Sequence, residues 1–129
     1  MGNDLGKAYK LCSHVIIEDV FATGDLIKSY PFVARIKLTK LPKQVPFQLV
    51  FSAPKRTFRK AYQRNKVKRL CKEAFRLNKC ELESALTDSN KQLALFLVFT
   101  SRDKITFDVL EKRVQKLIKK IIIQLESHD

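Results

Sequence analysis

The residues best suited to chemistry in this chain are cations crowded into one segment. From Lys55 to Lys79 the sequence holds eleven Lys or Arg residues and a single acid, Glu73. Five of the cations recur at every fourth position: Lys60, Arg64, Lys68, Lys72 and Arg76. On a helix this spacing makes one gently winding basic stripe, and like charges so placed weaken an isolated helix. The pattern indicates a partner that relieves the repulsion, and RNA phosphates are the natural candidate.

Asn65 differs in kind from its basic neighbours. Its amide can donate and accept, so it could read a 2′-hydroxyl or a base edge, or hold a metal-bound water. An ordinary exposed helix asparagine is the equal alternative. Arg64 and Arg69 can bridge phosphate oxygens in a bidentate manner, whereas Lys66 and Lys68 act as point charges.

Hydrolysis by the protein alone is not supported by any set of side chains in the sequence. The acids are scattered without a metal-binding motif, and His14 and His128 are isolated. Three cysteines, Cys12, Cys71 and Cys80, form no CxxC pair, which indicates thiols in a reducing compartment. We therefore expect no catalytic residue and no firm metal site in the protein, and we reject a protein-only nuclease.

Composition bounds the class of protein. A chain of 129 residues with 45% hydrophobic content suits one domain over 1–129, and a net charge of +13 favours a polyanionic partner. No stretch reaches the roughly 20 apolar residues of a membrane helix, and no signal peptide is apparent. The expected location is the cytoplasm, with no membrane partner.

Periodicity predicts the elements that must position these residues. Ser13 can cap a helix through about Ala22, which Gly24 then ends. Alternation predicts strands over 32–41 and 47–53, paired as an antiparallel hairpin, and helical spacing predicts a long helix over 58–78. A polar connection over 80–92, with at most one helical turn, leads to a central strand over 93–99. Thr106 can cap the last helix, with Ile105 and Leu110 as a hydrophobic staple.

This order of elements predicts the fold class. Helix, two strands, helix, strand and helix make a small α/β (α+β) two-layer sandwich with a mostly antiparallel sheet and about three helices.

A family resemblance enters at the basic helix. The run RNKVKRLCKEAFR, from Arg64 to Arg76, resembles the signature of the bacterial ribonuclease P protein family, roughly RNRxKRxxREAFR. The segment SAPKR over 52–56 and the segment VFATG over 20–24 resemble its flanking elements, so the likeness covers nearly the whole chain. Two departures stand out. Lys66 and Lys72 replace the usual Arg, and the segment between Arg56 and Arg64 is longer by one residue than the commonest form.

The resemblance implies a function and a partner. The family's protein pairs with a large catalytic RNA, which removes the 5′ leader from precursor tRNA with bound Mg²⁺. The protein holds RNA and leader and raises metal affinity, on a ribosomal-protein-like fold with an unusual left-handed crossover. Eight residues of the motif helix would face the RNA: Lys60, Arg64, Asn65, Lys66, Lys68, Arg69, Lys72 and Arg76.

The resemblance also implies a cleft between the sheet and the N-terminal helix for the single-stranded leader. Such RNA needs stacking faces within a basic groove. The candidate stacking platforms are Phe21 and Phe32. The candidate phosphate contacts are Arg35, Lys37, Lys55 and Arg56. Either phenylalanine also fits a core position, and that alternative stays open on pattern alone.

A second class of function fits the same composition. A structural RNA-binding protein or RNA chaperone, ribosomal-protein-like and without a role in cleavage, would be as basic and as small. The motif from Arg64 to Arg76 favours the ribonuclease P subunit, with the catalytic RNA and precursor tRNA as partners and no DNA expected.

Overall fold

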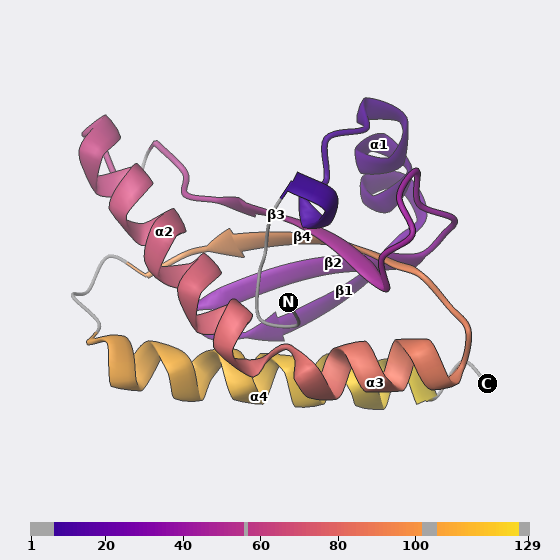
Figure 1. Ribbon diagram of the computed structural model, residues 1–129. Coiled ribbons are helices and arrows are strands. Elements are labelled where there is room, and N and C mark those ends of the chain that lie inside the picture. The colour runs from indigo at the N-terminus through magenta and orange to yellow at the C-terminus, as the bar shows by residue number, and fades with distance from the viewer. Residues whose placement is uncertain (1–6, 56, 102–105, 127–129) are drawn as a thin grey trace.

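A four-stranded sheet lies at the centre of the molecule (Figure 1). The computed structural model describes residues 7–55, 57–101 and 106–126. The strands are β1 (Asp25–Ser29), β2 (Phe32–Leu38), β3 (Phe47–Ser52) and β4 (Leu93–Phe99). They lie in the order β1-β2-β4-β3, with β1–β2 and β2–β4 antiparallel and β3–β4 parallel. The prediction of a mostly antiparallel sheet is thereby confirmed.

Helices lie against both faces of this sheet (Figure 1). Within the described ranges they are α1 (His14–Thr23), α2 (Ala61–Asn78), α3 (Cys80–Asp88) and α4 (Phe107–Glu126), with a short 3₁₀ turn η1 (Lys7–Tyr9). The helices α2, α3 and α4 cover one face, while α1 packs on the other. None of these described helices is long and apolar enough to cross a membrane.

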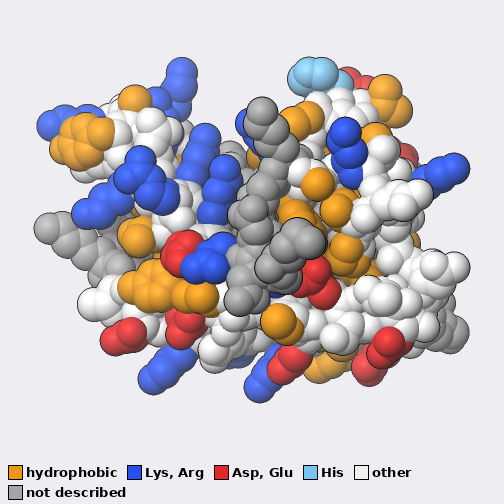
Figure 2. Space-filling model, in the orientation of Figure 1, with side chains coloured by type: hydrophobic (Ala, Val, Ile, Leu, Met, Phe, Trp, Pro, Cys, Tyr) orange, Lys and Arg blue, Asp and Glu red, His pale blue; other side chains and the backbone are white. Residues whose placement is uncertain are grey.

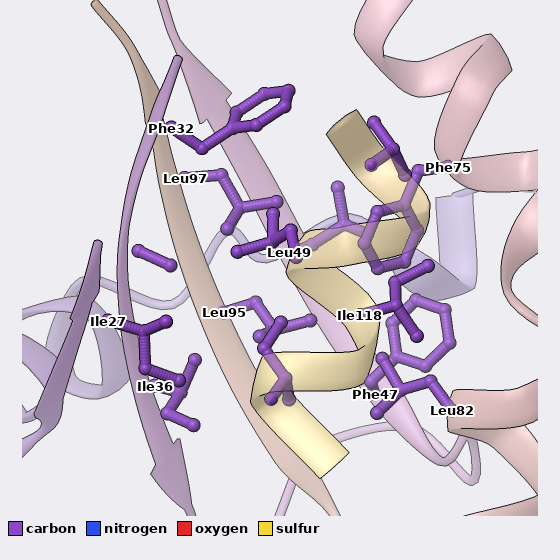
Figure 3. Packing of buried hydrophobic residues seen from close by; sticks show 14 of the residues in the cluster. Ile27, Phe32, Ile36, Phe47, Leu49, Phe75, Leu82, Leu95, Leu97 and Ile118 are labelled. Carbon is purple, nitrogen blue, oxygen red and sulfur yellow. The ribbon is translucent and has the colours of Figure 1, made fainter. Parts of the chain in front are cut away.

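The larger hydrophobic core lies between the sheet and helices α2 to α4, where Phe47, Leu49, Phe75, Leu95 and Ile118 meet (Figure 3). A smaller cluster under α1 is built from Leu11, Val20, Leu41 and Ala94. Strand β4 contributes to both clusters because alternate side chains point to opposite faces. The expected central strand, covered on both faces, is confirmed.

The predicted hairpin between 32–41 and 47–53 is wrong. Strand β4 lies between β2 and β3, pairing antiparallel with the first and parallel with the second. A strand that is apolar throughout loses most by exposure, so it takes the central position. The side chain of Gln92 holds the connection from β2 to β3, because its Nε2 donates to the carbonyls of Lys43 and Val45.

Two elements of the structure, β1 and α3, were not predicted from the sequence. Strand β1 was not expected, and it forms the sheet edge beside β2. Helix α3 replaces most of the expected polar connection, because Leu82 and Leu86 at a spacing of four are buried on one side of it. Glu81 and Glu83 in its first turn also favour the helix dipole.

The ends of α1 and the start of α4 lie at the residues that the sequence predicted for them. Ser13 Oγ accepts a hydrogen bond from Ile16 N at 3.3 Å, and Thr106 Oγ1 accepts one from Val109 N at 3.4 Å. Ile105 of the predicted staple lies outside the described residues. Gly24 follows α1 where a Cβ would approach the backbone oxygens of Val20 to 2.3 Å and Ile36 to 2.9 Å. Only glycine lets the chain pass there.

Candidate nucleic-acid interface

Helix α2 carries the dense basic segment. Its buried side consists of Cys71, Ala74 and Phe75, so the helix is held against the core along its C-terminal half. Burial raises the pKa of the Cys71 thiol to about 12, which makes this cysteine an inert packing residue. At 100° per residue the stripe starts on the buried side at Arg64 and winds away from it, so that Arg76 lies on the opposite side, next to Arg69.

The helix begins at Ala61 rather than at the predicted Phe58. The backbone N–H groups of Thr57 and Phe58 both donate to the carbonyl of Pro54. The ring of Phe58 then packs 5.9 Å from that of Phe99. These local bonds close a turn that begins at Pro54, and Lys60 is the residue that precedes the helix.

The structure brings the eight predicted RNA-facing residues together on this one helix and its first flanking position. Lys60, Asn65, Lys66, Arg69 and Lys72 are exposed, and Arg64, Lys68 and Arg76 are partly exposed. Figure 2 shows Lys and Arg side chains gathered over α2. The predicted contacts are therefore accessible to solvent along one helix, and we call their cations the basic face of α2.

Two of these eight residues already have intramolecular partners. Arg64 Nη1 donates to the carbonyls of Phe58 at 2.9 Å and Arg59 at 3.1 Å, so this guanidinium orders the turn that leads into α2. Arg76 Nε donates to Glu73 Oε2 at 3.0 Å, and this hydrogen bond lowers the pKa of the glutamate. Both arginines keep only part of their hydrogen-bonding capacity for a ligand.

The other cations among these eight residues are available to bind a ligand. Within the described part of the chain, Lys66, Lys68, Arg69 and Lys72 have no acidic partner within ion-pair distance. Lys60 lies 5.8 Å from the ring of Tyr62, whose side chain is 65% exposed. Lys79, at the end of the same basic segment, is fully buried and does not belong to this face.

A second candidate surface lies on the sheet face beside α1. Arg35 of β2 and Phe96 of β4 occupy paired positions, and Val50 of β3 continues the same row. The ring of Phe21, from α1, meets the ring of Phe96 edge-on at 4.6 Å, and the Arg35 guanidinium lies 5.4 Å from the centre of the Phe21 ring. Phe21 is 46% exposed, so its aromatic surface can receive another ring.

Phe32 is not part of this surface, and its prediction as a stacking platform is wrong. Its side chain is 1% exposed and packs edge-on against Phe99 in the main core. The alternation of β2 sends Phe32 to the face covered by α2 and α4, away from Arg35.

Phe96 is the residue that sequence reasoning missed. It lies in the apolar run over 93–99, where every position was expected to be core. The available signal was the period of two, since Leu95 and Leu97 face the main core and Phe96 must then face the other side.

The remaining predicted leader contacts differ in their environment. Lys37 Nζ donates to Asp19 Oδ2 and to Thr23 Oγ1, both at 2.6 Å, so it ties β2 to α1. Its hydrogen bond lowers the pKa of Asp19. Lys55 is exposed after β3, and Arg56 lies outside the described residues. The described residues also contain no group of three or more His, Cys, Asp and Glu side chains that could hold a metal ion.

Comparisons with known proteins agree on one family. The family model described as ribonuclease P matches residues 5–122. A ribonuclease P protein component of Porphyromonas gingivalis is 30% identical over 117 residues, which is 91% of this chain and 85% of that protein.

Solved structures share the fold. The RNase P protein of Thermotoga maritima superposes with a TM-score of 0.67 at 19% sequence identity, over 86% of this chain and 96% of that one. A Staphylococcus aureus RNase P protein mutant, described as defective in mRNA degradation, gives a TM-score of 0.70 at 19% identity, over 89% of each chain.

Proposed function

Because the chain belongs to the ribonuclease P protein family, we propose that it is the protein subunit of the ribonucleoprotein that removes the 5′ leader of precursor tRNA. In this family an RNA performs the hydrolysis. The task left to the protein is to bind the catalytic RNA and the leader, and its side chains suit binding rather than bond cleavage.

Binding of the catalytic RNA is assigned to the basic face of α2. The observation that carries this assignment is the set of exposed or partly exposed cations without acidic partners among the described residues, Lys66, Lys68, Arg69 and Lys72. Each can neutralise a phosphate and release its condensed counterion. Arg69 can also hold two phosphate oxygens at once, a geometry that the lysines do not offer.

Binding of the leader is assigned to the sheet face beside α1. An unpaired base can stack on the exposed ring of Phe21, which the ring of Phe96 supports from below. The guanidinium of Arg35 lies close to the Phe21 ring, so it can contact the phosphate of a nucleotide whose base stacks on that ring. Lys37 serves this surface indirectly, because its bonds to Asp19 and Thr23 hold α1 over the sheet.

Magnesium fits this assignment as an ion held mainly by the RNA. Mg²⁺ prefers oxygen ligands in octahedral geometry and is usually held by one or two carboxylates together with phosphates. The described residues contain no group of three or more His, Cys, Asp and Glu side chains that could hold a metal ion, so RNA phosphates would supply most of the ligands, and the exposed amide of Asn65 could bind a metal-bound water. When bound by the RNA, the ion would supply an activated water for hydrolysis, and the cations of α2 would supply the charge that brings the phosphates together.

Reconstitution tests the proposal. The purified protein is mixed with a ribonuclease P RNA and precursor tRNA at low Mg²⁺ concentration, and 5′ maturation is measured. We expect stimulation by the protein, and we expect it to be lost when Lys66, Lys68, Arg69 and Lys72 are all replaced by Gln. Circular dichroism of the quadruple variant checks that it remains folded.

Two results would contradict the proposal. Folded wild-type protein that leaves the RNA reaction unchanged would refute the assignment as a subunit. Cleavage by the protein without RNA would show that the chemistry resides in the protein after all.

A further inference from the structure

A second basic surface lies on α4, outside the motif that the family resemblance uses. Its five cations are Lys112, Arg113, Lys116, Lys119 and Lys120, and we call this set the α4 stripe. From Lys112 to Ile123 the helix contains no acid. At 100° per residue the five cations fall within an arc of about 120°. The buried side chains, from Leu110 to Leu125, occupy the opposite side of the helix.

Three lysines of this stripe have no acidic partner among the described residues. Lys112, Lys116 and Lys119 are exposed, and no acidic group lies within ion-pair distance of them in the described ranges. The other two cations of the stripe each contact a residue of another segment. Arg113 lies 5.9 Å from the centre of the Tyr30 ring, and Lys120 Nζ donates to the carbonyl of Lys28 at 3.0 Å.

Of the three acids of α4, Asp108 lies in the first turn, four residues before Lys112, and forms no ion pair with a described residue. The other two lie apart from the stripe. Glu111 accepts a hydrogen bond from Asn78 Nδ2 of α2 at 3.3 Å, and Glu126 lines a hollow with Asp88 of α3 at the far end. A solvated helix gains stability when opposite charges lie four residues apart. Here Lys112, Lys116 and Lys120 are like charges at that spacing. As on α2, the repulsion is relieved when a polyanion binds.

The kind of polyanion follows from what the stripe lacks. A helix that binds a membrane surface needs a free apolar face, whereas the apolar face of α4 is already buried against the sheet. Exposed apolar side chains occur only near the two ends of the stripe, at Val109 and Ile123. A lysine ammonium group is a point charge and lacks the paired, planar donors of a guanidinium, so it suits backbone phosphates rather than base edges.

The position of the stripe separates it from the leader surface. Helix α4 covers the face of the sheet opposite α1, and in Figure 2 Lys and Arg side chains project, together with Asp and Glu side chains, from the lower edge of the molecule, where α3 and α4 lie in Figure 1. Its neighbour in the fold is α2, since the side chain of Gln115 donates to Asn78 Oδ1 at 2.8 Å. The two basic helices are therefore packed against each other.

We propose that the α4 stripe binds the phosphate backbone of a second segment of the RNA that binds α2. This inference rests on the proposed function and extends the RNA-binding surface to a second side of the protein. From Lys112 to Lys119 the stripe is about 10 Å long at 1.5 Å per residue, which suits contact with a few phosphates. It contributes affinity without reading sequence.

The test compares two triple variants that lose the same charge. The first replaces Lys112, Lys116 and Lys119 with Gln. The control replaces Lys10, Lys40 and Lys43, which are exposed lysines on other elements, with Gln. Affinity for a ribonuclease P RNA is measured against salt concentration. We expect the α4 variant to make the log–log slope shallower by about 2 to 3, with at least tenfold weaker binding, because each phosphate contact contributes about 0.9. The control should keep the wild-type slope.

Other outcomes separate this inference from the proposed function. The α2 quadruple variant is measured alongside. If it loses RNA affinity while the α4 variant behaves like the control, the α4 inference is overturned and the proposed function stands. If neither variant changes RNA affinity, both the α4 inference and the proposed function fail. A further measurement uses vesicles of anionic phospholipid. If the wild type binds them, the α4 variant does not, and the RNA affinity of the variant is unchanged, the stripe binds a membrane surface and the α4 inference is overturned.

Discussion

The two surfaces proposed to bind RNA, the basic face of α2 and the sheet face beside α1, are built in different ways. On α2 the cations lie on one helix within a short stretch of sequence, and most of them have no partner among the described residues. On the sheet face, Phe21, Arg35 and Phe96 come from three elements and contact one another at 4.6 and 5.4 Å. A charged surface can be encoded by local periodicity, whereas a stacking site has to be assembled by the fold.

This difference predicts how each surface responds to mutation. Exposed cations act additively and are screened by salt, so any one of them contributes little. A stacking platform is a single ring in a fixed position, and its loss removes the whole contact. The mutations below test this comparison, from the largest expected effect to the smallest.

Lys79→Met is expected to have the largest effect, and it acts through stability. The Lys79 side chain is fully buried, its ammonium lies 2.6 Å from Glu83 Oε1, and the ring of Tyr9 lies 5.0 Å away. Methionine keeps the apolar stem but leaves Glu83 without its cation, at a cost of about 3 kcal/mol. Urea unfolding measures the loss.

The matched control for this variant is Lys72→Met, the same substitution at an exposed site on the basic face of α2. It should change the free energy of unfolding by less than about 0.5 kcal/mol. Equal effects at the two positions would show that the buried ion pair is unimportant for holding the end of α2.

Phe21→Ala is expected to weaken binding of a single-stranded leader oligonucleotide. Stacking of one base is worth about 1–3 kcal/mol, so the dissociation constant should rise between about 5-fold and 150-fold. Fluorescence anisotropy with a labelled oligonucleotide measures it. Val15→Ala is a control at a more exposed site on the same helix. Unchanged affinity in a folded variant would remove Phe21 from the leader site, and loss of the fold would make it a core residue.

Arg69→Gln is expected to have a smaller effect, spread evenly over RNA sequences. Removing one phosphate contact should make the salt dependence of binding shallower by about 1 in the log–log slope. Filter binding over a range of salt concentrations, with two unrelated RNA sequences, measures this. A large loss confined to one sequence would mean that α2 reads bases, and the comparison between the two surfaces would break down.

Asp19→Asn is expected to have the smallest effect, and one that depends on pH. The hydrogen bond from Lys37 lowers the pKa of Asp19 below its ordinary value of 3.8. Stability from this pair is therefore present above that value and lost as the pH falls through the lowered pKa. Thermal unfolding should distinguish the variant from the wild type near neutral pH but not at a pH below the lowered pKa, where the carboxyl group of Asp19 is protonated. A difference that persists in acid would contradict the role of this ion pair.

Local patterns proved sufficient for the elements that depend on short stretches of chain. The caps of α1 and α4, the alternation of β2 and the basic stripe of α2 were all predictable, because each follows from a period of two or nearly four residues. The motif from Arg64 to Arg76 also identified the family, because side chains that meet one partner on one helix face stay close in sequence.

Tertiary structure decided which residues share a surface. The insertion of β4 between β2 and β3 is a pairing between distant segments, and nothing in either segment alone specifies it. That pairing places Arg35 next to Phe96 and sends Phe32 into the core. It likewise takes packing of η1 against β3 and α3 to bury Lys79 with Tyr9 and Glu83. The sequence alone determined where the charge lies, because periodicity is local. Burial depends on which layer covers each face, and only the assembled fold determines that.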